Sequence, residues 1–294
     1  MNVMLHVIVT DITGETGLKI VGNILAGERD PERLAAHHNY RCHASTAEII
    51  AALTGNYRAE HLLALKQKFA AYEFLLQQIA ECADQIERLL TCLAAQQPPP
   101  ATPLPATRRT RAAKHQPQFD IRGPLHRLTG GVDLSQIDNI GPQAALQLIG
   151  EIGTDMARWP SAKHFTSWLA LAPNNKISGG RLLSSRTPPS VNRAAAILRR
   201  CAMSLTRTST ALGAFYRRLA ARVGKAKAIT ATARKLAVII YSVLSGQLVY
   251  NDPGAIPYHQ LHRTRELKSL RHRARLLGFH LVDQITGEVL NPVT

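Results

Sequence analysis

The stretch YRAEHLLALKQKFAAYEFLLQQIAECADQIERLLTCLAA, residues 57–95, is the longest regular pattern in the chain and decides its architecture. Apolar residues recur along it at alternating spacings of three and four: Leu62, Leu65, Phe69, Tyr72, Leu76, Ile79, Ala83, Ile86, Leu90 and Leu93. This spacing places them on one face of a helix and is typical of a coiled coil. Such a face needs a partner within the chain or in another copy, and we expect a homo-oligomer.

The composition of the 294-residue chain indicates a folded, mostly α protein. Hydrophobic residues make up 45% of it and aromatic residues only 5%, and Ala and Leu dominate, which favours helices over sheets. The cysteines are Cys42, Cys82, Cys92 and Cys201. They lack Cys-x-x-Cys spacing, which indicates reduced thiols in a cytosol rather than a zinc site or a disulfide scaffold. The first residues lack the basic flank and the cleavage site of a signal peptide.

Residues 1–56 precede the long repeat and predict short helices. The run TGLKIVGNILAGERDPERLAAHH is expected to form two helices separated near Pro31. A capping box of Ser45 and Glu48 opens the next helix. The apolar run VMLHVIV at residues 3–9 is expected to form a strand or the frayed remnant of one.

Residues 96–123 are expected to form a Pro-rich basic linker. The run QQPPPATPLPATRRTRAAKHQP has no hydrophobic periodicity, so it is extended where Pro is dense. Its cations are Arg108, Arg109, Arg111, Lys114 and His115. They either follow a phosphate backbone or belong to a solvated tether, which is the commoner case.

Positive charge is concentrated after residue 95. Residues 1–95 carry eight Lys and Arg against eleven Asp and Glu, whereas residues 96–294 carry 28 against nine, a net charge of +19. Arg outnumbers Lys in the second segment, which suits bidentate phosphate contacts. We therefore expect a nucleic acid as partner, because neutralised phosphates release condensed counterions. No continuous apolar span or basic amphipathic anchor indicates a membrane partner.

Residues 124–294 show helical patterns with short connections and are expected to form a C-terminal domain. Within it, SQIDNIGPQAALQLIGEIG at residues 135–153 has the form of a helix-hairpin-helix element. Gly141 supplies its turn, Pro142 suits the first position of a helix, and Asn139 replaces the usual first Gly. Backbone N–H groups at Gly141 can hold a DNA phosphate without reading sequence. A plain helical hairpin in the core, without any phosphate contact, is an equally good interpretation of this segment.

Two later runs predict helices of opposite character. AITATARKLAVIIYSVLSG, residues 228–246, is expected to be the central core helix. Lys235 within it either contacts phosphate or lays its stem along the core. LHRTRELKSLRHRARLLGFHLV, residues 261–282, predicts a basic amphipathic helix that either faces solvent or contacts DNA.

The loop KISGGRLLSSRTPPSVNR, residues 176–193, collects the residue types that phosphoryl transfer needs. Ser178 is followed by Gly179 and Gly180, so no bulky side chain blocks a phosphodiester from its hydroxyl. The cations of the loop are Lys176, Arg181, Arg186 and Arg193. They can stabilise charge on a pentacoordinate phosphorus, and a serine hydroxyl is a weak nucleophile that needs such help. From these residues alone, a turn with capping serines is the commoner explanation.

Seven segments occur in an order that resembles a known family. They are DITGETGLKIVGNILAGERDPERLA, GNYRAEHLLALKQ, IDNIGPQAALQLIGEIG, WLALAPNNKISGGR, NRAAAILRRCA, LGAFYRRLAARVGKAKAITATARKLAVIIY and LGFHLV. Together they resemble bacterial insertion-sequence transposases in which a coiled coil joins a RuvC-like domain to a serine-carrying transposase domain. These are DNA recombinases guided by a bridge RNA. The resemblance covers most of the chain.

The resemblance implies a DNA transposase of the bacterial cytoplasm that cleaves and rejoins strands through a serine nucleophile. Ser178 matches the serine of the family's Ser-Gly motif, and the domain at residues 124–294 would be the serine transposase domain. DNA and a guide RNA are the implied partners. The cations of the loop, with Gly179, Gly180 and Gly141, would then contact DNA phosphates.

The sequence departs from the family at its start. The family's RuvC-like domain carries an acidic tetrad that binds divalent metal, and residues 1–56 are expected to be connector helices after a missing domain of this kind. The nearby acids are Asp11, Glu15, Glu28 and Asp30, where helix caps are expected. No metal ligand is assigned to them, and Mg²⁺ is expected only with the missing domain.

Two other functions stay open at this stage. One is a catalytically inactive DNA- or RNA-binding module that modulates a full-length transposase. The other is a purely structural helical protein whose charge is incidental. A steep loss of DNA affinity with salt argues against the second.

Overall fold

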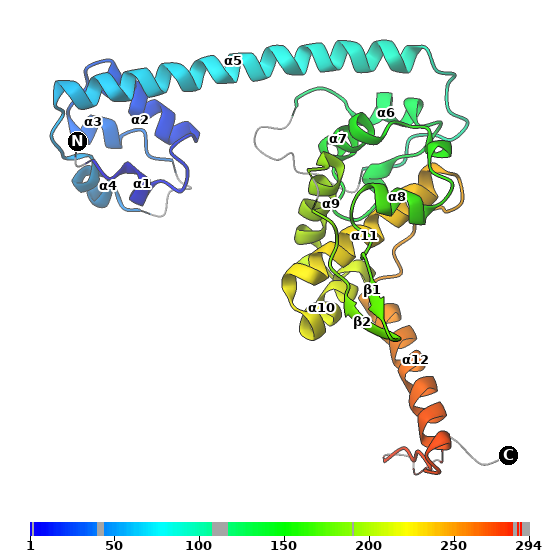
Figure 1. The fold of residues 1–294 in the computed structure, drawn as a ribbon. Helices are drawn as coiled ribbons and strands as arrows, with labels where there is room; N and C mark the ends of the chain where they lie inside the picture. The colour runs from blue at the N-terminus through cyan, green and yellow to red at the C-terminus, as the bar shows by residue number, and fades with distance from the viewer. Residues whose placement is uncertain are drawn as a thin grey trace. The chain divides into compact units, whose positions relative to one another are not determined.

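The apolar repeat forms one 37-residue helix, α5 (Ala59–Ala95), close to its predicted bounds. At a rise of 1.5 Å per residue the helix is about 55 Å long. The chain divides within α5 into two units, residues 1–85 and 86–294. The computed structural model in Figure 1 describes residues 1, 3–39, 44–107, 117–189, 191–284, 287 and 289, which are mostly helical as predicted.

The first unit consists of short helices and the beginning of α5. They are α1 (Leu5–Ile8), α2 (Glu15–Leu25), α3 (Pro31–Ala35) and α4 (Thr46–Leu53). The capping box is confirmed, because the Glu48 carboxylate accepts from Ser45 N at 2.7 Å and Ser45 Oγ accepts from Glu48 N at 3.3 Å. The expectation of a strand at residues 3–9 is wrong. Leu5 is buried there as part of α1, so its apolar run serves a helical core.

The apolar face of α5 is only partly covered. Leu62, Leu65 and Phe69 pack against the core of the first unit, which centres on the fully buried Leu34 and Leu53. In the middle of the helix the repeat is open to solvent, whereas Leu90 near its end is 6% exposed and belongs to the core of the second unit. Ile79 is 60% exposed and Ile86 is 43% exposed.

The second unit contains the remaining helices and a two-stranded ribbon. Its elements are α6 (Arg122–Leu128), α7 (Pro142–Ile152), α8 (Ala162–Trp168), β1 (Lys176–Ser178), β2 (Arg181–Ser184), α9 (Arg193–Ser204), α10 (Ala211–Val223), α11 (Lys225–Leu244) and α12 (Ala255–Leu276). Three short 3-10 helices connect them: Leu134–Gln136, Met156–Arg158 and Leu205–Arg207.

Helix α11 is the centre of this unit, as its apolar sequence predicts. Leu236, Ala237 and Ile240 are 1% exposed or less, and the helix packs against α8, α9 and α10 (Figure 1). The Tyr241 hydroxyl donates to the carbonyl of Trp159 at 2.9 Å. The loop before α8 is therefore held on the core by a buried hydrogen bond.

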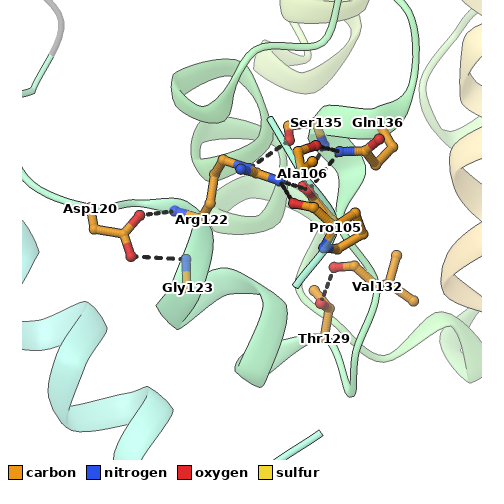
Figure 2. A network of polar contacts seen from close by, with 10 residues as sticks. Pro105, Ala106, Asp120, Arg122, Gly123, Thr129, Val132, Ser135 and Gln136 are labelled. Carbon is orange, nitrogen blue, oxygen red and sulfur yellow. Dashed lines mark hydrogen bonds and ion pairs between the residues drawn. The ribbon is translucent and has the colours of Figure 1, made fainter. Parts of the chain in front are cut away.

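The described part of the Pro-rich linker lies on the second unit. Arg127 Nε donates to the carbonyl of Gln97 at 2.7 Å, and Arg122 Nη2 donates to the carbonyl of Pro105 at 2.6 Å (Figure 2). This end of the linker is not a free tether, because guanidinium groups hold its carbonyls. The five linker cations, Arg108, Arg109, Arg111, Lys114 and His115, lie outside the described residues.

Arg122 also forms a buried ion pair with Asp133, at 2.6 Å between Nη2 and Oδ2. The two side chains are only 15% and 5% exposed. Arg122 Nε donates to Ser135 Oγ, and the Gln136 amide donates to Asp133 (Figure 2). Burial alone would raise the pKa of Asp133, but hydrogen bonds from Ser135, Arg122 and Gln136 together hold it below its usual value.

The described cysteines are free thiols. Cys82 and Cys92 are exposed on α5, and Cys201 is buried in α9. Cys42 lies outside the described residues. Within the described ranges, no helix combines the length and the apolar character that crossing a bilayer requires.

Candidate functional site

The serine loop folds as an antiparallel ribbon of β1 and β2, which the sequence interpretation missed (Figure 1). Gly179 and Gly180 form its two-residue turn, with φ values of 54° and 73°. Two successive positive φ values belong to the turn that best matches the twist of a hairpin. A Gly-Gly pair between short β-compatible runs is a hairpin signal that was available in the sequence.

The two glycines are needed for the backbone conformation of the turn and not for the space around it. A Cβ atom added at Gly179 or Gly180 would meet no atom within 4 Å. Their left-handed conformations, however, are strained for most other residues. The access of a phosphodiester to Ser178 therefore results from the exposed position of the ribbon.

The register of the ribbon sorts its side chains into two faces. Ser178 pairs with Arg181, and Lys176 pairs with Ser184. Paired residues share a face, and side chains alternate along β1, so these four lie on one polar face. The register shifts between Lys176 and Ile177, because β2 contains Leu183 as an extra residue there. Ile177 pairs with Leu182 on the opposite face, where they are 64% and 57% exposed.

A hollow of about 580 Å³ adjoins the polar face. Its lining residues are Asn174, Lys176, Ser184, Arg186, Thr187, Pro188, Pro189 and Arg199. Two of the predicted cations, Lys176 and Arg186, meet here, and Arg199 of α9 joins them. The sequence interpretation missed Arg199, because a helix pattern does not show which loop its arginines face. Ser178 and Arg181 lie at the turn end of the ribbon and do not line the hollow.

Arg193 lies apart from this group. It is the first residue of α9, and its guanidinium lies 3.7 Å from the Glu151 carboxylate with 84% of the side chain exposed. An exposed pair at this distance contributes little to stability.

Gly141 also lies elsewhere, as the residue that caps α7. Pro142 occupies the first turn of α7, and Asn139 has a φ of 61°, as the sequence predicted for both. The expected first helix of the hairpin is only the 3-10 turn Leu134–Gln136. Gly141 itself is buried with extended backbone angles, so its role as a phosphate contact stays a prediction.

The acids near the N-terminus act locally and do not fit the divalent metal of the resembled family. Asp30 caps α3, the Glu28 carboxylate accepts from two following backbone N–H groups, and Glu15 pairs with Lys19 at 2.7 Å. The hydrogen bonds from Asp30 and Arg29 lower the pKa of Glu28. Among the described residues no three His, Cys, Asp or Glu side chains gather as metal ligands would.

Comparison with known proteins adds one match. Residues 133–217 match the model of the Transposase IS116/IS110/IS902 family. The matched segment contains Gly141, the ribbon and Arg193, but covers less than a third of the chain. No curated protein and no solved structure matches the chain significantly. The match supports the interpretation of the chain as an insertion-sequence transposase.

Proposed function

We propose that this protein is a DNA transposase of an insertion sequence, in which Ser178 cleaves and rejoins DNA strands. The observation that carries the proposal is the polar face of the ribbon, which places Ser178 beside Arg181 and on the same side as Lys176. The ribbon lies within the segment that matches the transposase family. The net charge of +19 after residue 95 further supports DNA as the partner.

The proposed step is a transesterification. A bond forms between Ser178 Oγ and phosphorus while one bridging P–O bond of the DNA breaks. The hydroxyl proton of Ser178 leaves to solvent, and the departing DNA oxygen takes up a proton. A DNA hydroxyl then attacks the phosphoserine and releases Ser178. The phosphodiester is conserved, so no nucleotide cofactor is required.

The cations have distinct places in this scheme. Arg181 faces the same side as Ser178 at the turn, where its charge would stabilise the transition state. Lys176, Arg186 and Arg199 surround the neighbouring hollow, where an adjacent phosphate of the same strand would lie. A guide RNA and a second copy along α5 remain part of the proposal.

One observation favours a second candidate, the inactive binding module. Among the described residues, none forms a side-chain hydrogen bond with the Ser178 hydroxyl, so no base is positioned on it in this structure. Such a module would keep the cationic surfaces and modulate an active transposase. The two candidates differ in whether a covalent adduct ever forms at Ser178.

A covalent-trapping assay decides between them. Labelled DNA carrying the ends of the element is mixed with the protein, with and without candidate RNA and Mg²⁺, and separated on a denaturing gel. We expect a shifted band that disappears in Ser178→Ala and persists in Ser184→Ala, its matched control on the same ribbon face. If the band disappears in Ser184→Ala but persists in Ser178→Ala, the nucleophile is Ser184 and not Ser178. Equal DNA binding without any band, even beside a RuvC-like partner, would establish the inactive module.

A further inference from the structure

Three cations from three neighbouring helices of the second unit lie near enough for their charges to interact. They are Arg218 of α10, Lys235 of α11 and Arg265 of α12, and all follow the segment that matches the family model. Arg218 Nε donates to the Tyr258 hydroxyl at 3.1 Å, which joins α10 to the start of α12. The backbone N–H of Ala255 donates to the carbonyl of Ser209 at 2.9 Å and fixes the same junction.

Aromatic rings support two of these cations. The Lys235 ammonium lies 4.7 Å from the centroid of the Phe215 ring. The Arg218 guanidinium lies 5.9 Å from the ring centroids of both Phe215 and Tyr258. Cation–π contacts orient such groups but do not neutralise their charge.

No described carboxylate forms an ion pair with any of the three. Lys235 and Arg265 are exposed, and Arg218 is half-buried. Partial desolvation lowers the pKa of Lys235, and the nearby charges of Arg218 and Arg265 lower it further. Like charges held together without a counterion favour the binding of an anion at this place.

The later part of helix α12 projects away from the other helices of the second unit (Figure 1). None of its 22 residues is buried. Its cations are Arg263, Arg265, Lys268, Arg271, Arg273 and Arg275. The acidic residue of α12 is Glu266, whose carboxylate lies 3.2 Å from His262 Nδ1. Although α12 packs against α10, its Arg and Lys side chains are all exposed, and this chemistry fits a polyanion.

We propose that the junction cluster of Arg218, Lys235 and Arg265, continued along α12, binds the phosphate backbone of duplex DNA away from the serine ribbon. The occupant follows from charge complementarity, since regularly spaced phosphates match cations along a helix of about 33 Å. The inference rests on the proposed function, which names DNA as substrate. It adds a second contact that would hold DNA without reading its sequence.

The test measures duplex DNA affinity by fluorescence anisotropy at several salt concentrations. The first variant combines Arg218→Gln, Lys235→Gln and Arg265→Gln. The slope of log K against log salt should fall by about 2.7, because each lost phosphate contact removes about 0.9. The matched control removes the same charge from exposed positions of α5 through Lys66→Gln, Lys68→Gln and Arg88→Gln, and should change the slope less.

The single variant Arg265→Gln tests the cluster without disturbing the fold, because the Arg265 side chain is exposed. It should lower the slope by about 0.9 while leaving the melting temperature unchanged. If the triple variant behaves like its α5 control, or if only binding of RNA or anionic vesicles falls, the inference is overturned and the proposed function stands. If the unaltered protein binds no DNA, both fail.

Discussion

Ser178 lies directly opposite Arg181 across the two-residue turn of the ribbon. This pairing places the Ser178 hydroxyl and the Arg181 guanidinium on the same face of the ribbon, although the two residues are separated only by the turn. The arrangement needs no long-range contact, because two glycines and a short register define it. The chemistry assigned to the site can therefore be tested through the turn itself.

Substitution at Gly180 should affect reaction more than DNA binding. Gly180→Ala places a Cβ at a φ of 73°, which costs about 1–2 kcal/mol. We expect roughly tenfold slower adduct formation, whereas Gly180→Asn should stay close to the unaltered protein because Asn tolerates this conformation. Single-turnover trapping measures both, and equal rates for the two variants would contradict a conformational role.

Two helical glycines should respond to alanine in opposite directions. A Cβ at Gly213 would lie 2.5 Å from the Thr208 carbonyl oxygen and 2.9 Å from that of Leu205. Because these are backbone atoms, Gly213→Ala should destabilise the second unit by about 1–3 kcal/mol. Gly150 on α7 has open space, so Gly150→Ala should stabilise the unit by up to about 1 kcal/mol. Urea unfolding of both variants provides the comparison.

Breaking the ion pair of Arg122 and Asp133 should be costly. Asp133→Ala leaves a buried guanidinium without its partner, and the expected loss is about 3–5 kcal/mol. The exposed pair of Glu151 and Arg193 serves as control, and Glu151→Gln should cost less than about 1 kcal/mol. Similar midpoints for the two variants in chemical denaturation would show that solvent screens the buried pair.

The same ion pair predicts a loss of stability in acid. The pKa of Asp133 lies below its usual value of 3.8, so its stabilising contribution is present above that pH. The contribution is lost as the pH falls from 3.8 through the lower pKa of the folded protein. Asp133→Asn should flatten this part of the stability profile, measured by unfolding at pH 2 to 6 as a rough range. A profile that is unchanged in the variant would assign the acid sensitivity to other groups.

The open part of the α5 repeat should mediate self-association. Ile79→Glu puts a charge into each apolar face, so a dimer would lose about 3 kcal/mol from two side chains. Sedimentation analysis should show dissociation at concentrations where the unaltered protein associates. Ala80→Glu adds the same charge outside the repeat and should leave the association intact. A monomer in all three proteins would remove the homo-oligomer from the proposal.

Much of the fold could be predicted from periodicity and caps. The 3–4 repeat of α5, the Ser45–Glu48 capping box and the apolar run of α11 each act within one helix, so local sequence suffices. The strand expected at residues 3–9 is wrong because so short an apolar run fits a strand or a helix turn equally well. Tertiary burial of Leu5 decides between them.

The candidate site was harder to predict, since its contacts are distant in sequence. The serine, its glycines and the loop cations follow from one local motif, but the ribbon register that pairs Ser178 with Arg181 does not. Arg199 reaches the hollow only through the packing of α9. The cluster of Arg218, Lys235 and Arg265 joins three helices that no short pattern connects.

Within the described part of the chain, the ribbon that carries Ser178 consists of two strands and no third strand pairs with either outer edge. Two-stranded ribbons have little stability of their own in water. On the proposed function, the hydroxyl is therefore aimed loosely in the free protein, and the entropy of fixing it is lost only when DNA settles on the polar face. An imprecise nucleophile makes few stray cuts. On that proposal, reactivity would depend on assembly of the protein with its DNA.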